Sequence, residues 1–146
     1  MSLSEFLARE GYRRVELGRN GVGHFEATGS LAGRAIRVLV DTGAASTVIS
    51  LALARELGLQ VTSLGRQGGG AGGVQLEIFQ LHDAELELNG AHVRPNGLYA
   101  MDLSHVNAAL AMKGASTIEA VLGADVFDRQ KAVIDYGSSS LFLKDA

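Results

Sequence analysis

One acidic residue, Asp41, stands where an apolar strand meets a tight turn. It follows the apolar run 38–40, opens the triplet Asp-Thr-Gly, and is followed by small residues at 44–46. An acid in this place is a turn residue, a helix N-cap or a catalytic carboxylate. The glycine turn and the small residues would hold the carboxylate in a cramped site lined by backbone N–H groups, which favours the catalytic interpretation.

A second segment, AVLGADVF at 120–127, strengthens this interpretation. It places two aliphatic residues before Gly123 and a short helical pattern after it. No other acid of the chain has the strand-acid-Thr-Gly setting of Asp41. Asp135 also follows aliphatic residues, but it leads into Tyr136-Gly137, which is typical of a hairpin turn.

Metal and cofactor chemistry have little support in the sequence. The chain has no cysteine, which excludes disulfides and thiolate chemistry. No two of the four histidines, at 24, 82, 92 and 105, have the i, i+4 spacing of a helical zinc site. Glu85 and Glu87 share one face of a predicted strand, where we expect a solvated face. We therefore expect no metal site and no cofactor.

A glycine-rich stretch, Gly68 to Gly73, matches the letters of the dinucleotide motif G-x-G-x-x-G. That motif requires a helix after it. Here the following residues alternate between apolar and polar, which predicts a strand. The stretch is therefore interpreted as a plain loop or a mobile hairpin tip. The chain also lacks a P-loop motif and a G-x-S-x-G nucleophile elbow.

Length and charge limit the class of protein. The chain has 146 residues, which predicts one domain, and a net charge of −3 with no basic stripe, which argues against nucleic acid as a partner. No apolar run approaches 18 residues, so we expect no membrane span. The first 17 residues lack the apolar core of a signal peptide. As given, the chain is expected to be cytoplasmic, or periplasmic or exported if a leader was removed.

The secondary structure pattern predicts a mainly β domain of barrel or sandwich type. About nine short strands are expected, with hairpin turns in 28–33, at Asn89-Gly90 and at 136–139. Two or three short helices are expected. One spans 4–10 with Ser4 as N-cap, one follows Ser50 and ends at Gly58, and one starts near Ser104 and ends before Gly114. A single helical turn is expected at 124–130.

Three segments together resemble the retropepsin-like aspartic peptidases. VLVDTGAASTVIS resembles their active-site strand and loop, AVLGADVF their hydrophobic-hydrophobic-Gly element, and DRQKAVIDYGSSSLFLK their closing hairpin. The glycine-rich stretch lies where the family has its flap. The resemblance covers about 23–144 and is strongest with bacterial single-domain members. It implies a closed, barrel-like retropepsin (acid protease) fold for 23–146, after an N-terminal extension at 1–22 with a short helix and strand.

The resemblance also implies roles for individual residues. Asp41 matches the catalytic aspartate, Thr42 the residue whose hydroxyl bonds to the other subunit's loop, and Gly43 the backbone position tight against the carboxylates. Ala44 matches the small residue that follows. The other matched positions are the flap, Gly68, Gly69, Gly70, Ala71, Gly72 and Gly73, and the supporting element, Val121, Leu122, Gly123 and Asp125, of which Asp125 is taken as structural. The flap is richer in glycine than is usual, and the segment 101–114 is longer than in viral members.

A single Asp-Thr-Gly implies two chains in the active enzyme. Peptide hydrolysis by carboxylates uses an acid and a base on either side of one water, and two close carboxyl groups share one proton. Since the chain supplies one such aspartate, the second must come from another copy. We expect a homodimer with the active site on its twofold axis, and an extended peptide or protein substrate in the groove between the subunits. Val121 or Leu98 is expected to line that groove.

Two alternatives remain open at the level of sequence. One is a catalytically inactive retropepsin-like module that serves in dimerisation or peptide binding. The other is a monomeric β domain in which Asp41 is only a turn residue.

Overall fold

Strands make up most of the secondary structure. A computed structural model describes residues 1–69 and 75–145. The strands are β1 (Tyr12–Glu16), β2 (Gly18–Arg19), β3 (Phe25–Leu31), β4 (Arg34–Val40), β5 (Val48–Ser50), β6 (Val61–Gly69), β7 (Gln75–Leu81), β8 (Leu86–Leu88), β9 (Ala91–His92), β10 (Tyr99–Met101), β11 (Ala120–Leu122), β12 (Val133–Asp135) and β13 (Ser140–Lys144). The helices are α1 (Leu3–Arg9), α2 (Leu51–Glu56), α3 (Ser104–Met112) and α4 (Ala124–Arg129). The mainly β prediction is confirmed.

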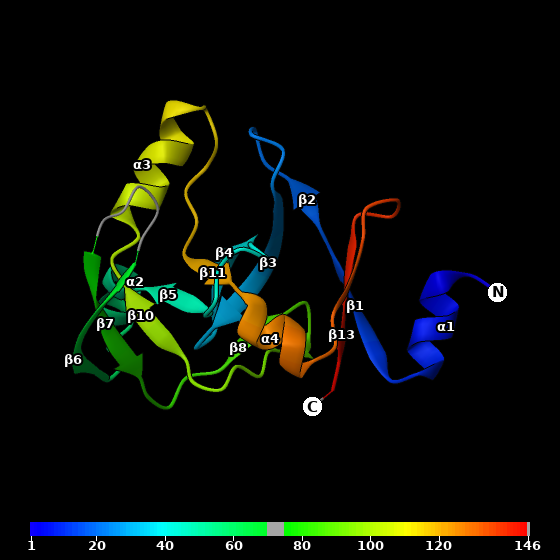
Figure 1. The fold of residues 1–146 in the computed structure, drawn as a ribbon, viewed down its shortest axis with the longest axis horizontal. Coiled ribbons are helices and arrows are strands. Elements are labelled where there is room, and N and C mark those ends of the chain that lie inside the picture. The colour runs from blue at the N-terminus through cyan, green and yellow to red at the C-terminus, as the bar shows by residue number, and fades with distance from the viewer. Residues whose placement is uncertain (70–74, 146) are drawn as a thin grey trace.

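The strands form two sheets that share one core (Figure 1). The larger has ten strands, with the order β6-β7-β10-β5-β11-β4-β3-β8-β9 and with β2 paired to β3. The smaller has the order β1-β13-β12, so a strand near the start of the chain pairs with the closing hairpin. Helix α1 lies at one end of the molecule and the β6–β7 arm at the other.

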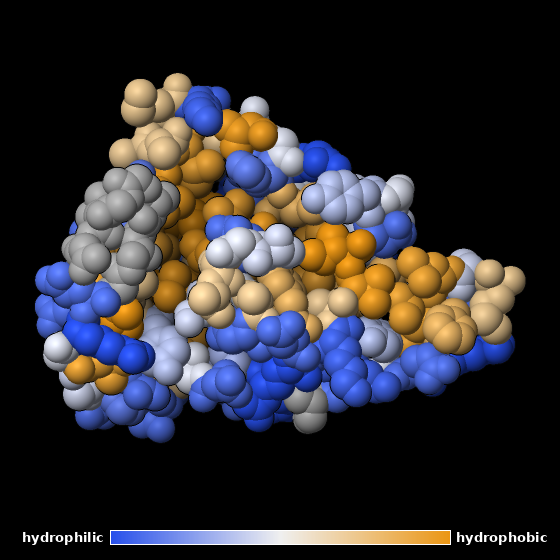
Figure 2. Space-filling model, viewed as in Figure 1, coloured by the Kyte–Doolittle hydropathy of each residue, from blue (hydrophilic) through white to orange (hydrophobic). Residues whose placement is uncertain are grey.

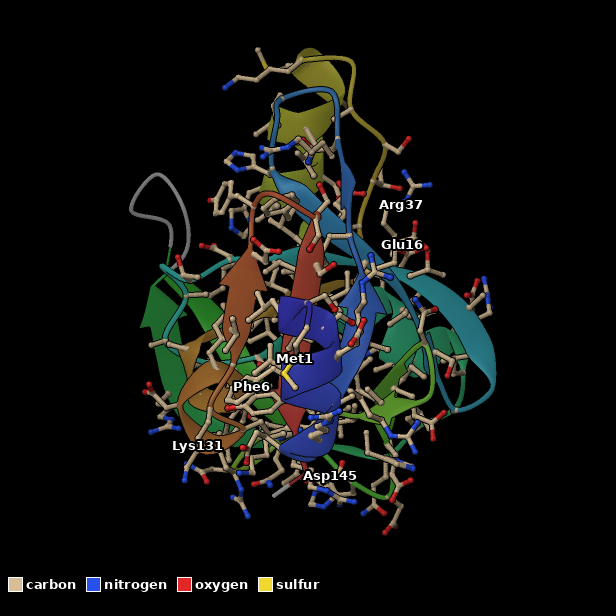
Figure 3. All side chains as sticks on the ribbon, turned by 90° about the vertical axis from the view of Figure 1, so that its right-hand side faces the viewer. Met1, Phe6, Glu16, Arg37, Lys131 and Asp145 are labelled. Carbon is tan, nitrogen blue, oxygen red and sulfur yellow. The ribbon has the colours of Figure 1, made fainter. Side chains whose placement is uncertain are left out.

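Helix α1 lies over the smaller sheet, as the side view in Figure 3 shows. Its buried contact is Leu7, whereas Met1 and Phe6 keep 75% and 47% of their surface exposed. No helix in residues 1–69 and 75–145 has the length and hydropathy needed to cross a bilayer.

Two predicted hairpins close through type I′ turns. Asn89 and Gly90 both have positive φ, 49° and 82°, between β8 and β9. Ala32 and Gly33 repeat this conformation, with φ of 49° and 80°, between β3 and β4. This turn matches the right-handed twist of the flanking strands, and it requires φ above zero at both central residues. The closing hairpin β12–β13 is likewise found with its turn at 136–139.

The helix predictions are right in place and partly wrong in detail. Ser50 caps α2 as expected, by accepting a hydrogen bond from the Leu53 N–H at 3.3 Å. The cap of α1 is Ser2, not Ser4, because the helix begins two residues earlier than predicted and Ser2 Oγ accepts from Glu5 N.

Ser104 is also not a cap, since it is the first residue of α3. Its N–H instead donates to the Asp102 carboxylate at 2.9 Å. The described residues hold four helices rather than two or three, because the segment at 124–129 is a full α-helix.

Helix α3 is held beside the central strands by its own small apolar cluster. The cluster consists of Leu103, Leu110, Ala115, Ile118 and Val121. Val121 belongs to β11, at the centre of the larger sheet. The helix and the segment after it are therefore packed against the same strand that supports the loop after β4.

One buried polar side chain, Gln130, ties three segments together after α4. Its Oε1 accepts from Arg94 N at 2.7 Å, and its Nε2 donates to the carbonyls of His92 and Lys144 at 3.1 and 3.2 Å. Only 1% of its surface is exposed. Because a buried polar side chain needs hydrogen-bond partners, Gln130 joins the end of β9 to β13.

We predict that Gln130→Leu lowers the free energy of unfolding by about 2–4 kcal/mol, because it removes three hydrogen bonds of a buried side chain, to Arg94 N and to the carbonyls of His92 and Lys144. Urea unfolding followed by circular dichroism measures the change. Gln60→Leu, at an exposed position, is the matched control and should change the value by less than about 0.5 kcal/mol. Equal effects of the two substitutions would contradict this role for Gln130.

Candidate active site

Asp41 lies at the end of β4, at the centre of the larger sheet. β4 runs parallel to β11, with Val40 opposite Leu122. The Asp41 N–H then donates to the Leu122 carbonyl at 3.0 Å. The last hydrogen bond of the parallel pair therefore fixes the backbone from which the carboxylate projects.

The Asp-Thr-Gly turn folds back on its own acid. Gly43 N donates to Asp41 Oδ1 at 2.9 Å, and Ala44 N donates to the Asp41 carbonyl at 3.1 Å. A Cβ at Gly43 would lie 3.3 Å from Asp41 Oδ1, which is tighter than an ordinary contact. Glycine at 43 thus allows the backbone to approach the half-buried carboxylate.

Thr42 lies on the outside of this turn. Its side chain is exposed, and its hydroxyl has no hydrogen-bond partner among residues 1–69 and 75–145. The side chain is thus available to a group outside this chain.

The predicted supporting element packs directly against the loop. Ala124 N donates to the Ala44 carbonyl at 2.7 Å, and Asp125 N donates to the Ala45 carbonyl at 3.3 Å. A Cβ at Gly123 would lie 2.8 Å from the carbonyl oxygens of Ala44 and Ser46. Such contacts with backbone atoms are too short to occur, so only glycine fits at 123.

A fully buried threonine, Thr47, completes this contact. Its hydroxyl donates to Asp125 Oδ1 at 2.8 Å and accepts from Gly123 N at 3.0 Å, while its own N–H donates to Asp125 Oδ2 at 3.1 Å. Its exposed fraction is 0%. Sequence analysis missed Thr47, because a threonine in an extended segment has no pattern that marks it as buried.

Asp41 is part of the wall of a cavity of about 370 Å³. The lining residues are Asp41, Gly43, Ala44, Ala45, Ser46, Val48, Arg66, Ile78, Tyr99, Met101, Leu103, His105, Val106 and Val121. Figure 2 shows this face as a hollow with hydrophobic surface, between the β6–β7 arm and the body of the molecule and below α3. The site is an apolar groove with few charged groups.

The predicted site residues are brought together only in part. Val121 lines the cavity as expected, whereas the expected lining residue Leu98 lies in the main core and faces a different hollow. Leu122 is fully buried behind the loop. Of the predicted flap, Gly68 and Gly69 end β6, and positions 70–73 lie outside the described residues.

Three side chains outside the cavity could share a cation. Ligand atoms of Glu85, Glu87 and His92 lie within 4.8 Å of one another, and His92 Nδ1 lies 3.3 Å from Glu87 Oε1. They meet because Glu87 and His92 are opposite each other in the β8–β9 pair. The group has the solvated surface expected of Glu85 and Glu87, and it is not part of the Asp41 cavity.

Sequence comparison assigns the family. Residues 27–129 match the family model described as "gag-polyprotein putative aspartyl protease", a span that holds both the Asp41 loop and Gly123. The chain belongs to this aspartyl protease family. No curated protein matches the chain in sequence.

Solved structures agree with the fold of this family. The chain is similar to a retropepsin-like aspartic protease from Rickettsia conorii, with 21% identity over 90% of each chain and a TM-score of 0.55. It is also similar to the retroviral protease-like domain of Ddi1 from Leishmania major, with 16% identity, 84% and 90% coverage and a TM-score of 0.56. A third similar structure is EIAV protease complexed with the inhibitor HBY-793, with 20% identity, 77% and 92% coverage and a TM-score of 0.52. The predicted retropepsin-like fold is confirmed.

We predict that Thr47→Val lowers the free energy of unfolding by about 1–3 kcal/mol. It keeps the side-chain shape, but it leaves the Gly123 N–H without its partner and removes one of the two donors to Asp125 Oδ1. Thermal unfolding checks this. Thr28→Val, an exposed threonine on β3, is the control with the same chemical change, and it should be close to neutral. A neutral Thr47→Val would show that the loop contact does not depend on this hydroxyl.

Proposed function

We propose that this chain is an aspartic endopeptidase that acts as a homodimer, with one Asp41 from each subunit. The observation that carries the proposal is the position of Asp41. Its carboxylate lies on the wall of an apolar cavity, next to an N–H donor and on a loop packed against Gly123. Membership in the aspartyl protease family supports the same chemistry.

The composition of the cavity supports the need for a second chain. Asp41 is the one carboxylate among the described residues that line it. Two carboxyl groups about 3 Å apart cannot both ionise and therefore share a proton. In the proposed dimer, the ionised Asp41 takes a proton from water, and the protonated Asp41 of the partner donates a hydrogen bond to the scissile carbonyl. The two roles exchange as the amine leaves.

The exposed Thr42 side chain fits the same arrangement. In a C₂ dimer with Asp41 on the axis, each Thr42 lies beside its symmetry mate's loop. Its hydroxyl would then hold the two loops in register. The substrate is an extended peptide that adds strand-type hydrogen bonds along the β6–β7 arm. No cofactor is required for this reaction.

Asp41→Asn should abolish peptide cleavage, because an amide cannot take a proton from water, while the fold is retained. The measurement is cleavage of an unstructured peptide pool between about pH 4 and pH 7, read by mass spectrometry, with statine-type inhibition as a second readout. Asp83→Asn is the matched control. Asp83 is exposed with φ of 54°, a conformation that asparagine accepts, and it is not part of the cavity.

Two outcomes would count against the proposal. Cleavage that survives in pure Asp41→Asn would assign the activity to another site. A wild-type protein that binds peptides as a dimer and never cuts them would instead be the inactive module considered from the sequence.

A further inference from the structure

Among the described residues that line the cavity beside Asp41, Arg66 is the one permanently charged cation. It lies on β6, in the arm that forms one wall of the groove, and lines the cavity together with Ile78 of the paired strand. Most of the remaining lining is aliphatic. Arg66 is exposed to solvent and also borders a second hollow with Gly65, Gln67 and Glu77. Its guanidinium is therefore hydrated in the free protein and can meet an anionic group that enters the groove.

An irregularity in β6 places Arg66 next to Ile78 of β7, on the wall of the groove. Ser63 is opposite Phe79, and the next aligned pair is Gln67 with Glu77, so three residues of β6 face the single residue Ile78. Regular pairing from Ser63 onward would put Arg66 two residues farther along the arm. The bulge therefore moves the side chain back by about 6–7 Å.

The bulge is built by specific contacts. Gly65 at its centre has φ of 68°, a left-handed conformation that glycine adopts without strain. Its N–H donates to Ser63 Oγ at 3.2 Å. The same Ser63 hydroxyl donates to the Glu77 carboxylate. Glu77, the acid nearest to Arg66 in the strand register, is thus already bound to another group.

Arg66 has no anionic partner in the described part of the chain. It forms no ion pair and no side-chain hydrogen bond with residues 1–69 and 75–145, Asp41 included. The other basic lining residue, His105, has an acidic neighbour in Asp102. Donation from the Ser104 hydroxyl and N–H lowers the pKa of Asp102 below its usual value.

We infer that Arg66 makes the groove selective for a peptide with an acidic side chain, glutamate or aspartate, at a residue close to the scissile bond. The inference rests on the proposed function and adds the substrate class to it. Glutamate fits best, because its two methylene groups can contact the aliphatic wall while its carboxylate reaches the guanidinium, which binds carboxylates through two parallel hydrogen bonds.

The test is a set of otherwise identical peptides with Glu, Gln or Lys at each of the two residues before and after the cleaved bond. At about pH 6 the glutamate is ionised. At one position or more, wild-type kcat/KM should be about 10- to 100-fold higher for Glu than for Gln, and lowest for Lys. Arg66→Gln should remove the advantage of Glu over Gln. Arg66→Lys should retain part of that advantage, and Arg66→Glu should favour Lys.

Arg34→Gln is the matched control, because Arg34 lies at the opposite end of β4 from Asp41 and pairs with Glu56 at the surface. It should keep the wild-type preference, and thermal unfolding should show all variants folded. Equal cleavage of Glu and Gln peptides by wild type would overturn the inference and leave the peptidase proposal intact.

If no peptide is cleaved at all, the peptidase proposal fails, and binding decides the inference separately. Fluorescence anisotropy with Asp41→Asn should then show tighter binding of Glu than of Gln peptides, and the added Arg66→Gln change should abolish the difference. Equal binding of the two peptides would overturn the inference.

Discussion

The contact between the loop at 41–47 and the start of α4 is the constraint on which the site depends. Two strands that run parallel, β4 and β11, end side by side, and the chain must turn away from both ends without a collision. Glycine at 123 allows the two turns to pack together, because a Cβ there would lie 2.8 Å from the carbonyl oxygens of Ala44 and Ser46. Thr47 and Asp125 then satisfy the polar groups that this close packing buries. This packing fixes the loop, and the Gly43 N–H within the loop then holds the Asp41 carboxylate.

The rest of the molecule adds walls to this fixed point. The β6–β7 arm contributes one side, and α3 with its apolar cluster contributes another. The result is a groove in which apolar surface predominates and each charge has an identifiable neighbour or a proposed one. The Asp41 carboxylate accepts a hydrogen bond from the Gly43 N–H, and His105 lies near Asp102. The position of Arg66 is set by the bulge in β6. In a groove of this kind a few charges determine what binds, since apolar contact alone discriminates weakly.

The sequence predicts the central part of this arrangement well, because local signals are strong there. Asn89-Gly90 and Ser50 each have one favourable local structure, and both occupy it. The Asp-Thr-Gly loop and the Gly123 element could be predicted as neighbours from the family resemblance, and their contact is present. The cap of α1 differs from the prediction because Ser2 and Ser4 are equally good caps by residue type, and the local sequence does not choose between them. Thr47, Gln130 and Arg66 could not be predicted, since burial of a polar group and a two-residue shift in strand register depend on distant partners.

The central claim is that one catalytic pair is made from two copies of Asp41. The most direct measurement is activity during titration of a fixed amount of wild-type protein with Asp41→Asn, at concentrations where all chains are paired and subunits exchange. A mixed dimer holds one carboxylate and one amide and should be inactive. The account predicts that an equal amount of the variant reduces the total activity to about half and that further variant reduces it further. Activity that stays constant at every ratio would show that each chain works alone and would contradict the account.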